Sequence, residues 1–331
     1  MQEIKVCQIG MGPLGIKIAE FIESRSSIKT IAAVDKNPAL IGKKLNEIGD
    51  NLSSNVEIME SIAKVLQNDK PNAVILTTVS DMERIVPQIK EIIAHGIPVV
   101  STCEELSYPW ESNPTLANEL DKAAKANNVA VLGTGINPGF LMDALPSFFT
   151  GICQDVTSVK VSRFQNASFR RVPFQKKIGA GLSLDEFDQR KQAGILRHVG
   201  LTESIQFIGR SLGWKLDRVT DEISPVVAKQ DYNNNGVSVK KGNATGVCQI
   251  GKGFINGSAK IELVFQATIG ENESYDEVVI EGSPGIKSKI QGGVNGDVAT
   301  CAITINAVRS ILGSNPGLRT MADVPMVSFT A

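Results

Sequence analysis

Histidine and cysteine are scarce in this chain, and their scarcity narrows the chemistry. Among 331 residues there are two histidines and five cysteines, with no Cys-x-x-Cys pair and no metal-ligand spacing. We therefore expect neither a zinc site nor any other metal. The odd number of scattered cysteines supports no disulfide framework, which favours a reducing cytoplasm. The sequence also has no P-loop and no Ser-His-Asp arrangement.

An excess of charge and long apolar runs are also missing. The 34 basic residues nearly balance 35 acidic ones, which gives no attraction for nucleic acid or an anionic membrane. No apolar run approaches 18 residues, and a strand expected to begin at Ile4 leaves no room for a signal peptide. We expect a soluble, cytoplasmic protein of two domains whose partner is a small molecule.

A glycine-rich turn follows the apolar run 4–9, directly before a helix-like segment. Gly10 allows the tight turn, Gly12 lets backbone approach a pyrophosphate, and Gly15 lets the helix pack closely on the strand. Pro13 suits the first helical turn because its missing N–H costs nothing there. The anion would lie at the positive end of the helix dipole. The residues expected to bind cofactor here are Gly10, Met11, Gly12, Pro13, Leu14 and Gly15.

A carboxylate at the end of the next strand strengthens this interpretation. Residues 30–34 read as a strand, and Asp35 ends it 20 residues after Gly15. A carboxylate there accepts hydrogen bonds from an adenosine ribose and repels a 2′-phosphate. The cofactor is therefore NAD or NADP, with NAD favoured by Asp35, although Lys36 partly offsets that charge. The alternative is that the glycines form only a structural turn.

Strand-like and helix-like segments then alternate as far as residue 132. This rhythm predicts an α/β fold whose N-terminal domain is a Rossmann, doubly wound parallel sheet. The expected strands are 73–77, 97–101 and 129–132, and the expected helices are 38–46, 57–67, 81–95 and 113–127. Ligands of such sheets sit beyond the carboxyl ends of the strands. Four further cofactor contacts are expected there, at Thr77, Thr78, Thr102 and Cys103.

Two features of the same crevice carry chemistry. Glu104 and Glu105 directly follow a strand, and one of them would serve as a general base toward water or an amine. The alternative is that both complement the dipole of a helix N-terminus. The segment 133–140, GTGINPGF, has more glycine than a hairpin needs and is expected to bring backbone close to a ligand. Asn137 and Phe140 in it are expected to contact substrate.

The pattern changes after about Gly139. Residues 218–291 are mostly strands that alternate apolar with polar side chains, which predicts a C-terminal α+β domain with a mixed or antiparallel open sheet. A second subunit is the commonest cover for such a sheet, so we expect a homodimer. The apolar helix 297–312 is expected to return to the first domain. The domains would then be 1–138 plus 295–331 for the dinucleotide, and 139–294 for substrate binding and dimerisation.

Basic residues in the second domain suggest a substrate site. Arg170 and Arg171 are adjacent in an extended segment, so at most one should face a given ligand, where a guanidinium fits a carboxylate bidentately. Lys176 and Lys177 read as a solvated basic patch. His198 either binds substrate or supports a loop.

Six segments carry a family resemblance, namely GMGPLG, STCEELSYP, GTGINPGF, FRRVPFQKKIG, RHVGLTES and GDVATCAITINAV with the later NPGLRTMADVP. Together they resemble the 2,4-diaminopentanoate dehydrogenases of the native amine dehydrogenase family, in the dihydrodipicolinate reductase-like superfamily. The resemblance extends from about residue 4 to residue 325. GTGINPGF and HVGLTES are much more specific than the glycine fingerprint.

The resemblance implies oxidation of the C4 amine of 2,4-diaminopentanoate by NAD(P)+. The products would be 2-amino-4-oxopentanoate and ammonia, in a step of ornithine degradation. It also places the family's catalytic glutamate, which follows the strand ending in STC, on Glu104. A carboxylate there would deprotonate the water that attacks the imine and assist loss of ammonia. Arg170 or Arg171 as anchor of the substrate carboxylate is our hypothesis.

Other activities stay open beside this one. The chain lacks the paired-histidine motif and the KxDAPSGTA loop of dihydrodipicolinate reductases, so lysine-pathway activity is not expected. The nearest alternatives are an imine reductase of related kind and an amine dehydrogenase for simpler amines without a carboxylate. A non-catalytic NAD-binding sensor is the distant one. It would bind NAD without amine-dependent NADH formation.

Overall fold

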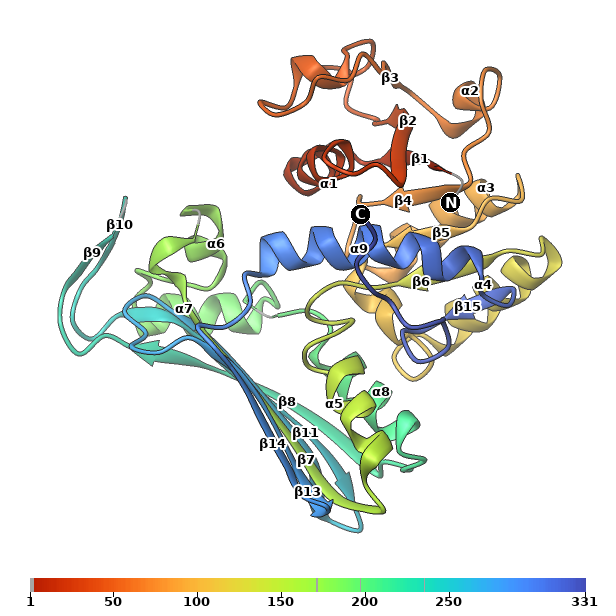
Figure 1. Ribbon diagram of the computed structural model, residues 1–331. Coiled ribbons are helices and arrows are strands. Elements are labelled where there is room, and N and C mark those ends of the chain that lie inside the picture. Colours follow the sequence, from red (N-terminus) through yellow and green to blue (C-terminus); the bar gives the residue numbers. More distant parts are fainter. Residues whose placement is uncertain (1–2, 171, 197, 235) are drawn as a thin grey trace. The chain divides into compact units, whose positions relative to one another are not determined.

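The computed structural model describes residues 3–170, 172–196, 198–234 and 236–331. The chain divides into two compact units. Unit 1 comprises Met1–Phe140 and Asn295–Ala331, and unit 2 comprises Leu141–Val294. The two units are described separately below, with the helices and strands labelled as in Figure 1.

Unit 1 is built on a seven-stranded sheet in which every strand pair is parallel. The strand order is β15-β6-β5-β4-β1-β2-β3, so the order reverses between β1 and β4. The strands are β1 (Ile4–Ile9), β2 (Ile28–Val34), β3 (Ile58–Met59), β4 (Ala73–Leu76), β5 (Val99–Ser101), β6 (Ala130–Gly133) and β15 (Gly317–Arg319). This sheet confirms the predicted doubly wound Rossmann architecture.

Helices cover both faces of this sheet because its strands are apolar on both sides. They are α1 (Pro13–Glu23), α2 (Ile62–Val65), α3 (Met82–Ile93), α4 (Pro114–Ala126) and α9 (Gly296–Leu312). One core cluster joins the sheet to α3 and α4 through residues such as Ile89 and Leu120. The other joins it to α1 and α9 through Ile18 and Ile305. The late helix α9 thus packs beside α1, as Figure 1 shows.

The predicted helix 38–46 is wrong. That segment forms turns and a short 3-10 helix, η1 (Leu45–Glu47). Its backbone bonds to a neighbouring segment instead, with the Leu45 N–H donating to Val56 O at 2.9 Å and the Asn46 N–H to Ser54 O at 3.1 Å. Gly42 has a positive φ of 83°, which ends any helical run there. Tertiary pairing therefore outweighs the local helical pattern.

Unit 2 is built on a six-stranded sheet of order β14-β13-β7-β12-β11-β8. Its strands are β7 (Asp155–Asn166), β8 (Arg218–Val227), β11 (Ala244–Ile255), β12 (Ser258–Thr268), β13 (Tyr275–Ser283) and β14 (Ile286–Gln291). The pair β12 and β7 is parallel and the others are antiparallel, so the sheet is mixed. A separate hairpin pairs β9 (Tyr232–Asn234) with β10 (Val237–Val239).

Helices cover one face of this sheet. The helices of unit 2 are α5 (Ala144–Phe149), α6 (Val172–Lys177), α7 (Leu184–Gln192) and α8 (Leu201–Ser211), with 3-10 turns η3 (Thr150–Ile152) and η4 (Ala167–Phe169). Helix α8 contacts β11, β12 and β8, and a Cβ at Gly251 would lie 2.7 Å from the Ile205 side chain. Small residues in β11 thus let α8 lie close to the sheet. Figure 1 shows α5 and α8 on the same side.

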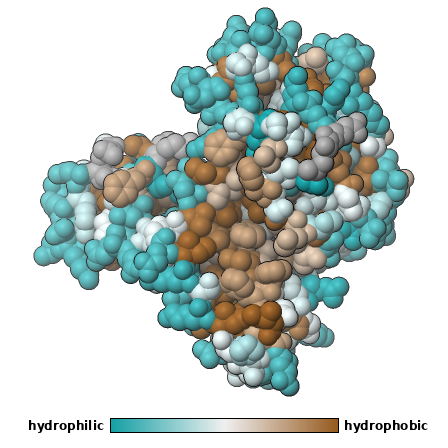
Figure 2. Space-filling model, viewed as in Figure 1, coloured by the Kyte–Doolittle hydropathy of each residue, from teal (hydrophilic) through white to brown (hydrophobic). Residues whose placement is uncertain are grey.

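The opposite face of the sheet keeps partly exposed side chains. Along β12, buried residues such as Leu263 alternate with half-buried ones such as Val264. Large apolar side chains are also exposed elsewhere in unit 2, at Phe148 in α5 and Ile152 in η3. Figure 2 shows hydrophobic as well as hydrophilic residues at the surface of the molecule. Exposed apolar surface of this kind is typical of association sites.

Candidate active site

The glycine-rich turn lies at the carboxyl end of β1, where the strand order reverses. Gly10 has a φ of +93°, and a Cβ on it would lie 2.6 Å from the Thr77 carbonyl oxygen. A Cβ on Gly15 would overlap the Gly10 carbonyl. Around Gly12, by contrast, a Cβ would meet nothing within 4 Å. Gly10 and Gly15 are therefore required by the protein's own backbone, whereas Gly12 faces open space that suits a bound group.

Helix α1 begins at this turn, and no side chain accepts a hydrogen bond from its N-terminal N–H groups. Gly12 is its N-cap residue and provides no side-chain hydrogen bond, Pro13 occupies the first turn, and that turn carries no acidic residue. A helix N-terminus without a capping side chain attracts an anion through its N–H groups and its dipole. The open space at Gly12 and the uncapped helix together fit the pyrophosphate of a dinucleotide.

Asp35 ties the end of β2 to this turn. Its Oδ2 accepts the Met11 N–H at 2.6 Å, and its Oδ1 accepts the Asn37 N–H at 2.7 Å. The Met11 N–H is thus directed at Asp35, which leaves Gly12 and Leu14 as the amides at the start of α1. A carboxylate has about four acceptor sites, so a half-buried Asp35 keeps capacity for two ribose hydroxyls.

Thr77 braces the turn from β4. Its hydroxyl donates to Gly10 O at 2.8 Å and accepts from the Gln8 amide, also at 2.8 Å. The neighbouring Thr78 is exposed and donates its hydroxyl to Gln88 in α3 at 2.9 Å. Gln8 was not among the predicted site residues. The available signal in the sequence was a polar amide in a mostly apolar strand, two residues before Gly10.

The two adjacent glutamates after β5 have different surroundings. They begin the 3-10 turn η2 (Glu104–Ser107). Glu105 Oε2 accepts the Met82 N–H at 2.8 Å, at the first residue of α3. Within the described residues, no hydrogen bond or ion pair reaches the half-buried carboxylate of Glu104. The structural role suggested for this acidic pair thus applies to Glu105, and Glu104 is the carboxylate left for chemistry.

Thr102 and Cys103 follow β5, where the backbone of Thr102 is hydrogen-bonded to β4 and the side chain of Cys103 is buried. The Thr102 N–H donates to Leu76 O at 3.2 Å and continues the sheet. Cys103 is 1% exposed and packs in the core beside α3 and α4. Burial raises the pKa of its thiol far above the usual range, and the charges of Glu104, Glu105 and Asp81 add to the effect. Cys103 is therefore a protonated core residue, and its predicted contact with the cofactor stays a prediction.

The segment 133–140 uses its glycines to approach protein backbone. A Cβ on Gly133 would lie 2.5 Å from the Leu106 carbonyl carbon, and one on Gly139 would overlap Gly135. The close approaches predicted here are thus made to η2 and within the segment itself. Both amide atoms of Asn137 are buried without a hydrogen-bond partner among the described residues. The Thr134 hydroxyl is buried without a partner in the same way, and Phe140 is half-buried, so this segment offers a ligand two unpartnered polar side chains.

In unit 2, Arg170 follows η4 in extended backbone and is half-buried. Its guanidinium lies over the ring of Phe174, 4.2 Å from the ring centroid. Arg171 lies outside the described residues, so its side chain is not placed. Arg170 is therefore the cation of this pair that the structure locates.

His198 of unit 2 is half-buried, and both its backbone N–H and its backbone carbonyl are hydrogen-bonded. The His198 N–H donates to Gln249 Oε1 at 2.8 Å, and Gln249 Nε2 donates to His198 O at 3.2 Å. Its ring packs on Phe265 with the centroids 4.5 Å apart, and its Nδ1 has no partner among the described residues. Burial, with the charges of Lys177 and Arg163, lowers the pKa of the imidazole to about 3. His198 is therefore neutral at physiological pH.

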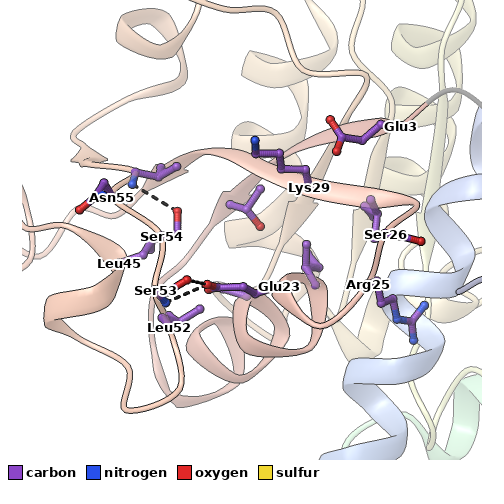
Figure 3. Close-up of a pocket in the computed structure, with 15 residues that line it drawn as sticks. Glu3, Glu23, Arg25, Ser26, Lys29, Leu45, Leu52, Ser53, Ser54 and Asn55 are labelled. Atoms are coloured by element: carbon purple, nitrogen blue, oxygen red, sulfur yellow. Dashed lines mark hydrogen bonds between the residues drawn. The ribbon is translucent and has the colours of Figure 1, made fainter.

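A larger pocket in unit 1 holds none of the predicted site residues. It has a volume of about 630 Å³ and lies along the amino end of β2, beside α1 and residues 52–56 (Figure 3). Glu23 points into this region and accepts the Ser53 N–H at 2.8 Å. The glycine turn and Asp35 follow the carboxyl ends of β1 and β2 instead. Pocket size alone therefore does not locate the dinucleotide site.

Comparison with known proteins identifies the family. The sequence profile described as the 2,4-diaminopentanoate dehydrogenase C-terminal domain matches residues 140–330. The 2,4-diaminopentanoate dehydrogenase of Acetoanaerobium sticklandii is 33% identical over 336 aligned positions, which cover 98% of this chain and 94% of that protein. The chain belongs to the 2,4-diaminopentanoate dehydrogenase family. The predicted resemblance is confirmed, as is the prediction that the protein is an enzyme, an oxidoreductase.

Solved structures share the fold of this family member. The amine dehydrogenase from Mycobacterium smegmatis superposes with a TM-score of 0.85 at 20% identity and covers 99% of this chain and 98% of its own. The WlbA dehydrogenase from Bordetella pertussis, solved with NADH and UDP-GlcNAcA, gives a TM-score of 0.53 at 13% identity, with 93% and 88% covered. At these identities the likeness shows a shared fold. Among the described residues, no helix is long and apolar enough to cross a membrane.

Proposed function

We propose that this family member catalyses the oxidative deamination of 2,4-diaminopentanoate at C4 with NAD(P)+, giving 2-amino-4-oxopentanoate, ammonia and NAD(P)H. One water is consumed, and the reverse reaction is a reductive amination. The name of the relative from Acetoanaerobium sticklandii, 33% identical over nearly the whole chain, supports this substrate. The observation that carries the proposal is the Glu104 carboxylate, which follows a strand of the Rossmann sheet and has no described partner.

The turn after β1 would hold the cofactor. Gly12 and Leu14 would face the pyrophosphate, and Asp35 the adenosine ribose, which favours NAD over NADP. Thr77 would keep the turn in shape through its bond to Gly10 O. When bound, the nicotinamide ring accepts the hydride that leaves C4 of the substrate. The complex of WlbA with NADH, in the same fold, supports a nicotinamide cofactor.

Glu104 would move the protons of the hydrolytic half of the reaction. Loss of hydride from C4 leaves a carbon doubly bonded to nitrogen, and water must add to that carbon. The Glu104 carboxylate would take a proton from this water and return it to the departing nitrogen, which leaves as ammonia. A carboxylate whose oxygens already accepted backbone N–H groups, as at Glu105, would be a poorer base.

The remaining predicted residues would bind the substrate. Asn137, with both amide atoms unpartnered, would hydrogen-bond it, and Phe140 would pack against its carbon chain. Arg170 would attract the carboxylate of the substrate from unit 2, with Arg171 as its predicted neighbour. His198 would contribute a neutral imidazole.

We also propose a homodimer in the cytoplasm that serves ornithine degradation. The half-exposed face of the unit 2 sheet is the surface proposed to pair, with unit 1 binding the cofactor and unit 2 the substrate. All five cysteines are free, which suits a reducing compartment. A monomeric mass by light scattering at micromolar concentration would contradict the dimer.

The test is amine-dependent formation of NADH, followed by its absorbance, with Glu105→Gln as the control for Glu104→Gln. We expect Glu104→Gln to lower kcat by about 10²- to 10⁴-fold while NAD still binds, because a general acid–base group contributes that much. Glu105→Gln should lower the free energy of unfolding, because the Met82 N–H loses a charged acceptor, and should leave kcat nearly unchanged. A wild type that forms no NADH with 2,4-diaminopentanoate would refute the substrate. Equal turnover of pentan-2-amine would favour an amine dehydrogenase for simpler amines.

A further inference from the structure

A small cavity in unit 2 is lined by side chains from four separate parts of the chain. Its volume is about 110 Å³. The lining residues are Phe174, Lys177, Ile178, Leu196, His198, Val247 and Phe265. The walls are apolar apart from one imidazole and one ammonium group. An apolar cavity with a few polar groups is the usual form of a ligand subsite.

The imidazole in this cavity is held firmly in place. The side-chain amide of Gln249 accepts a hydrogen bond from the His198 N–H and donates one to the His198 carbonyl. Its Nε2 also lies 2.8 Å from each carboxylate oxygen of Asp221. The ring packs on Phe265. A neutral imidazole has one N–H donor and one acceptor, and a buried ring nitrogen without a partner is costly. Nδ1 of His198 is such an atom among the described residues, which points to a ligand nearby.

The positive charge beside this imidazole is not neutralised. Lys177 is the last residue of α6, and no ion pair reaches it within the described residues. It lies close enough to His198 for its charge to help keep the ring neutral. Arg163, the other nearby cation, is only 3% exposed and is paired with Asp276 at 2.7 Å. Lys177 is thus the charge that an anion would meet here.

The groups that line the cavity indicate the chemistry of its ligand. An imidazole and an ammonium group in otherwise apolar walls suit an anion attached to an aliphatic chain, and the carboxylate end of diaminopentanoate has that form.

We infer that this cavity is the subsite for the carboxylate end of the substrate, with Lys177 as the counter-charge and His198 as a neutral hydrogen-bond donor. The inference rests on the proposed function and adds to it the residue that separates amino-acid substrates from simple amines. Lys177 acts as a specificity-determining residue, and no covalent or proton-transfer step is assigned to it.

The kinetic test compares Lys177→Met with Lys176→Met, since Lys176 is adjacent, equally exposed and absent from the cavity. With 2,4-diaminopentanoate, Lys177→Met should raise KM by about tenfold to a hundredfold and leave kcat within about twofold, because a charge-assisted contact is lost. KM for pentan-2-amine, which has no carboxylate, should not change. Lys176→Met should change neither. Equal effects of the two variants would overturn the assignment.

A second measurement needs no turnover. The chain has two histidines, so protein labelled with ¹⁵N-histidine gives signals from His198 and from exposed His95 only. Norvaline keeps the carboxylate and lacks the C4 amine. It should shift the His198 signals, leave those of His95 in place, and lose its effect in Lys177→Met. Pentan-2-amine should have no effect on His198.

The two proposals fail differently in these experiments. If the wild type forms NADH with diaminopentanoate while norvaline leaves His198 unmoved, the subsite is refuted and the function stands. If norvaline shifts His198 only when Lys177 is present, but no NADH forms, the carboxylate subsite stands and the substrate is refuted.

Discussion

The glycine-rich turn of unit 1 and the His198 cavity of unit 2 offer a ligand different groups: backbone amides in unit 1 and side chains in unit 2. The proposed cofactor site of unit 1 consists of backbone amides at an uncapped helix start and open space at Gly12. The proposed subsite of unit 2 consists of the side chains of Lys177 and His198, and the backbone of His198 is already hydrogen-bonded to Gln249. Binding by backbone N–H groups requires glycine at the position where the ligand approaches the backbone. Binding by side chains requires polar groups that have no hydrogen-bond or ion-pair partner within the protein. Substitutions should therefore act differently in the two.

The largest effect should come from Gly15→Ala, because its Cβ would overlap the Gly10 carbonyl, which cannot move cheaply. We expect a loss of about 2–4 kcal/mol in the free energy of unfolding, together with loss of NAD binding. Gly12→Ala meets no protein atom and should cost about 1 kcal/mol or less, yet raise the Kd for NAD at least about tenfold. Urea unfolding and NADH fluorescence titration separate the two. If Gly12→Ala bound NAD normally, the crevice would not be a pyrophosphate site.

The two regions differ in how much of each could be predicted from the sequence. The glycine spacing and Asp35 could be predicted because the motif is local and its strands and helix are continuous in sequence. Glu104 and Glu105 have the same chemistry and adjacent places. What separates them is the Met82 N–H at the start of α3, which sequence alone did not connect to them. His198 could be selected as a candidate from the sequence, but its surroundings could not be predicted, because its neighbours Gln249 and Phe265 lie in strands far away in the sequence.

Asp35→Ser should have the next largest effect. The change removes the acceptor of the Met11 and Asn37 N–H groups and the charge that disfavours a 2′-phosphate, while Lys36 stays. We expect KM for NAD to rise about tenfold and the ratio of kcat/KM for NADP to that for NAD to rise by at least as much. Steady-state kinetics with both cofactors measure this ratio. An unchanged ratio would mean that Asp35 only shapes the turn and does not read the ribose.

Without any substitution, the stability of unit 2 should depend on pH. Burial lowers the pKa of His198 from its ordinary value of 6.5 to about 3 in the folded protein, so between these values the unfolded chain binds a proton that the folded chain does not. Stability should therefore be fully present above about pH 6.5 and fall as the pH drops, by about 1.4 kcal/mol per pH unit. The chain has one tryptophan in each unit, and in Trp110→Phe the remaining Trp214 reports on unit 2. Urea unfolding of this variant between pH 7.5 and pH 5 should show the slope, and adding His198→Phe should reduce it by about one proton. An identical slope in both would mean that His198 is protonated inside the cavity, and its role as a neutral donor beside Lys177 would fail.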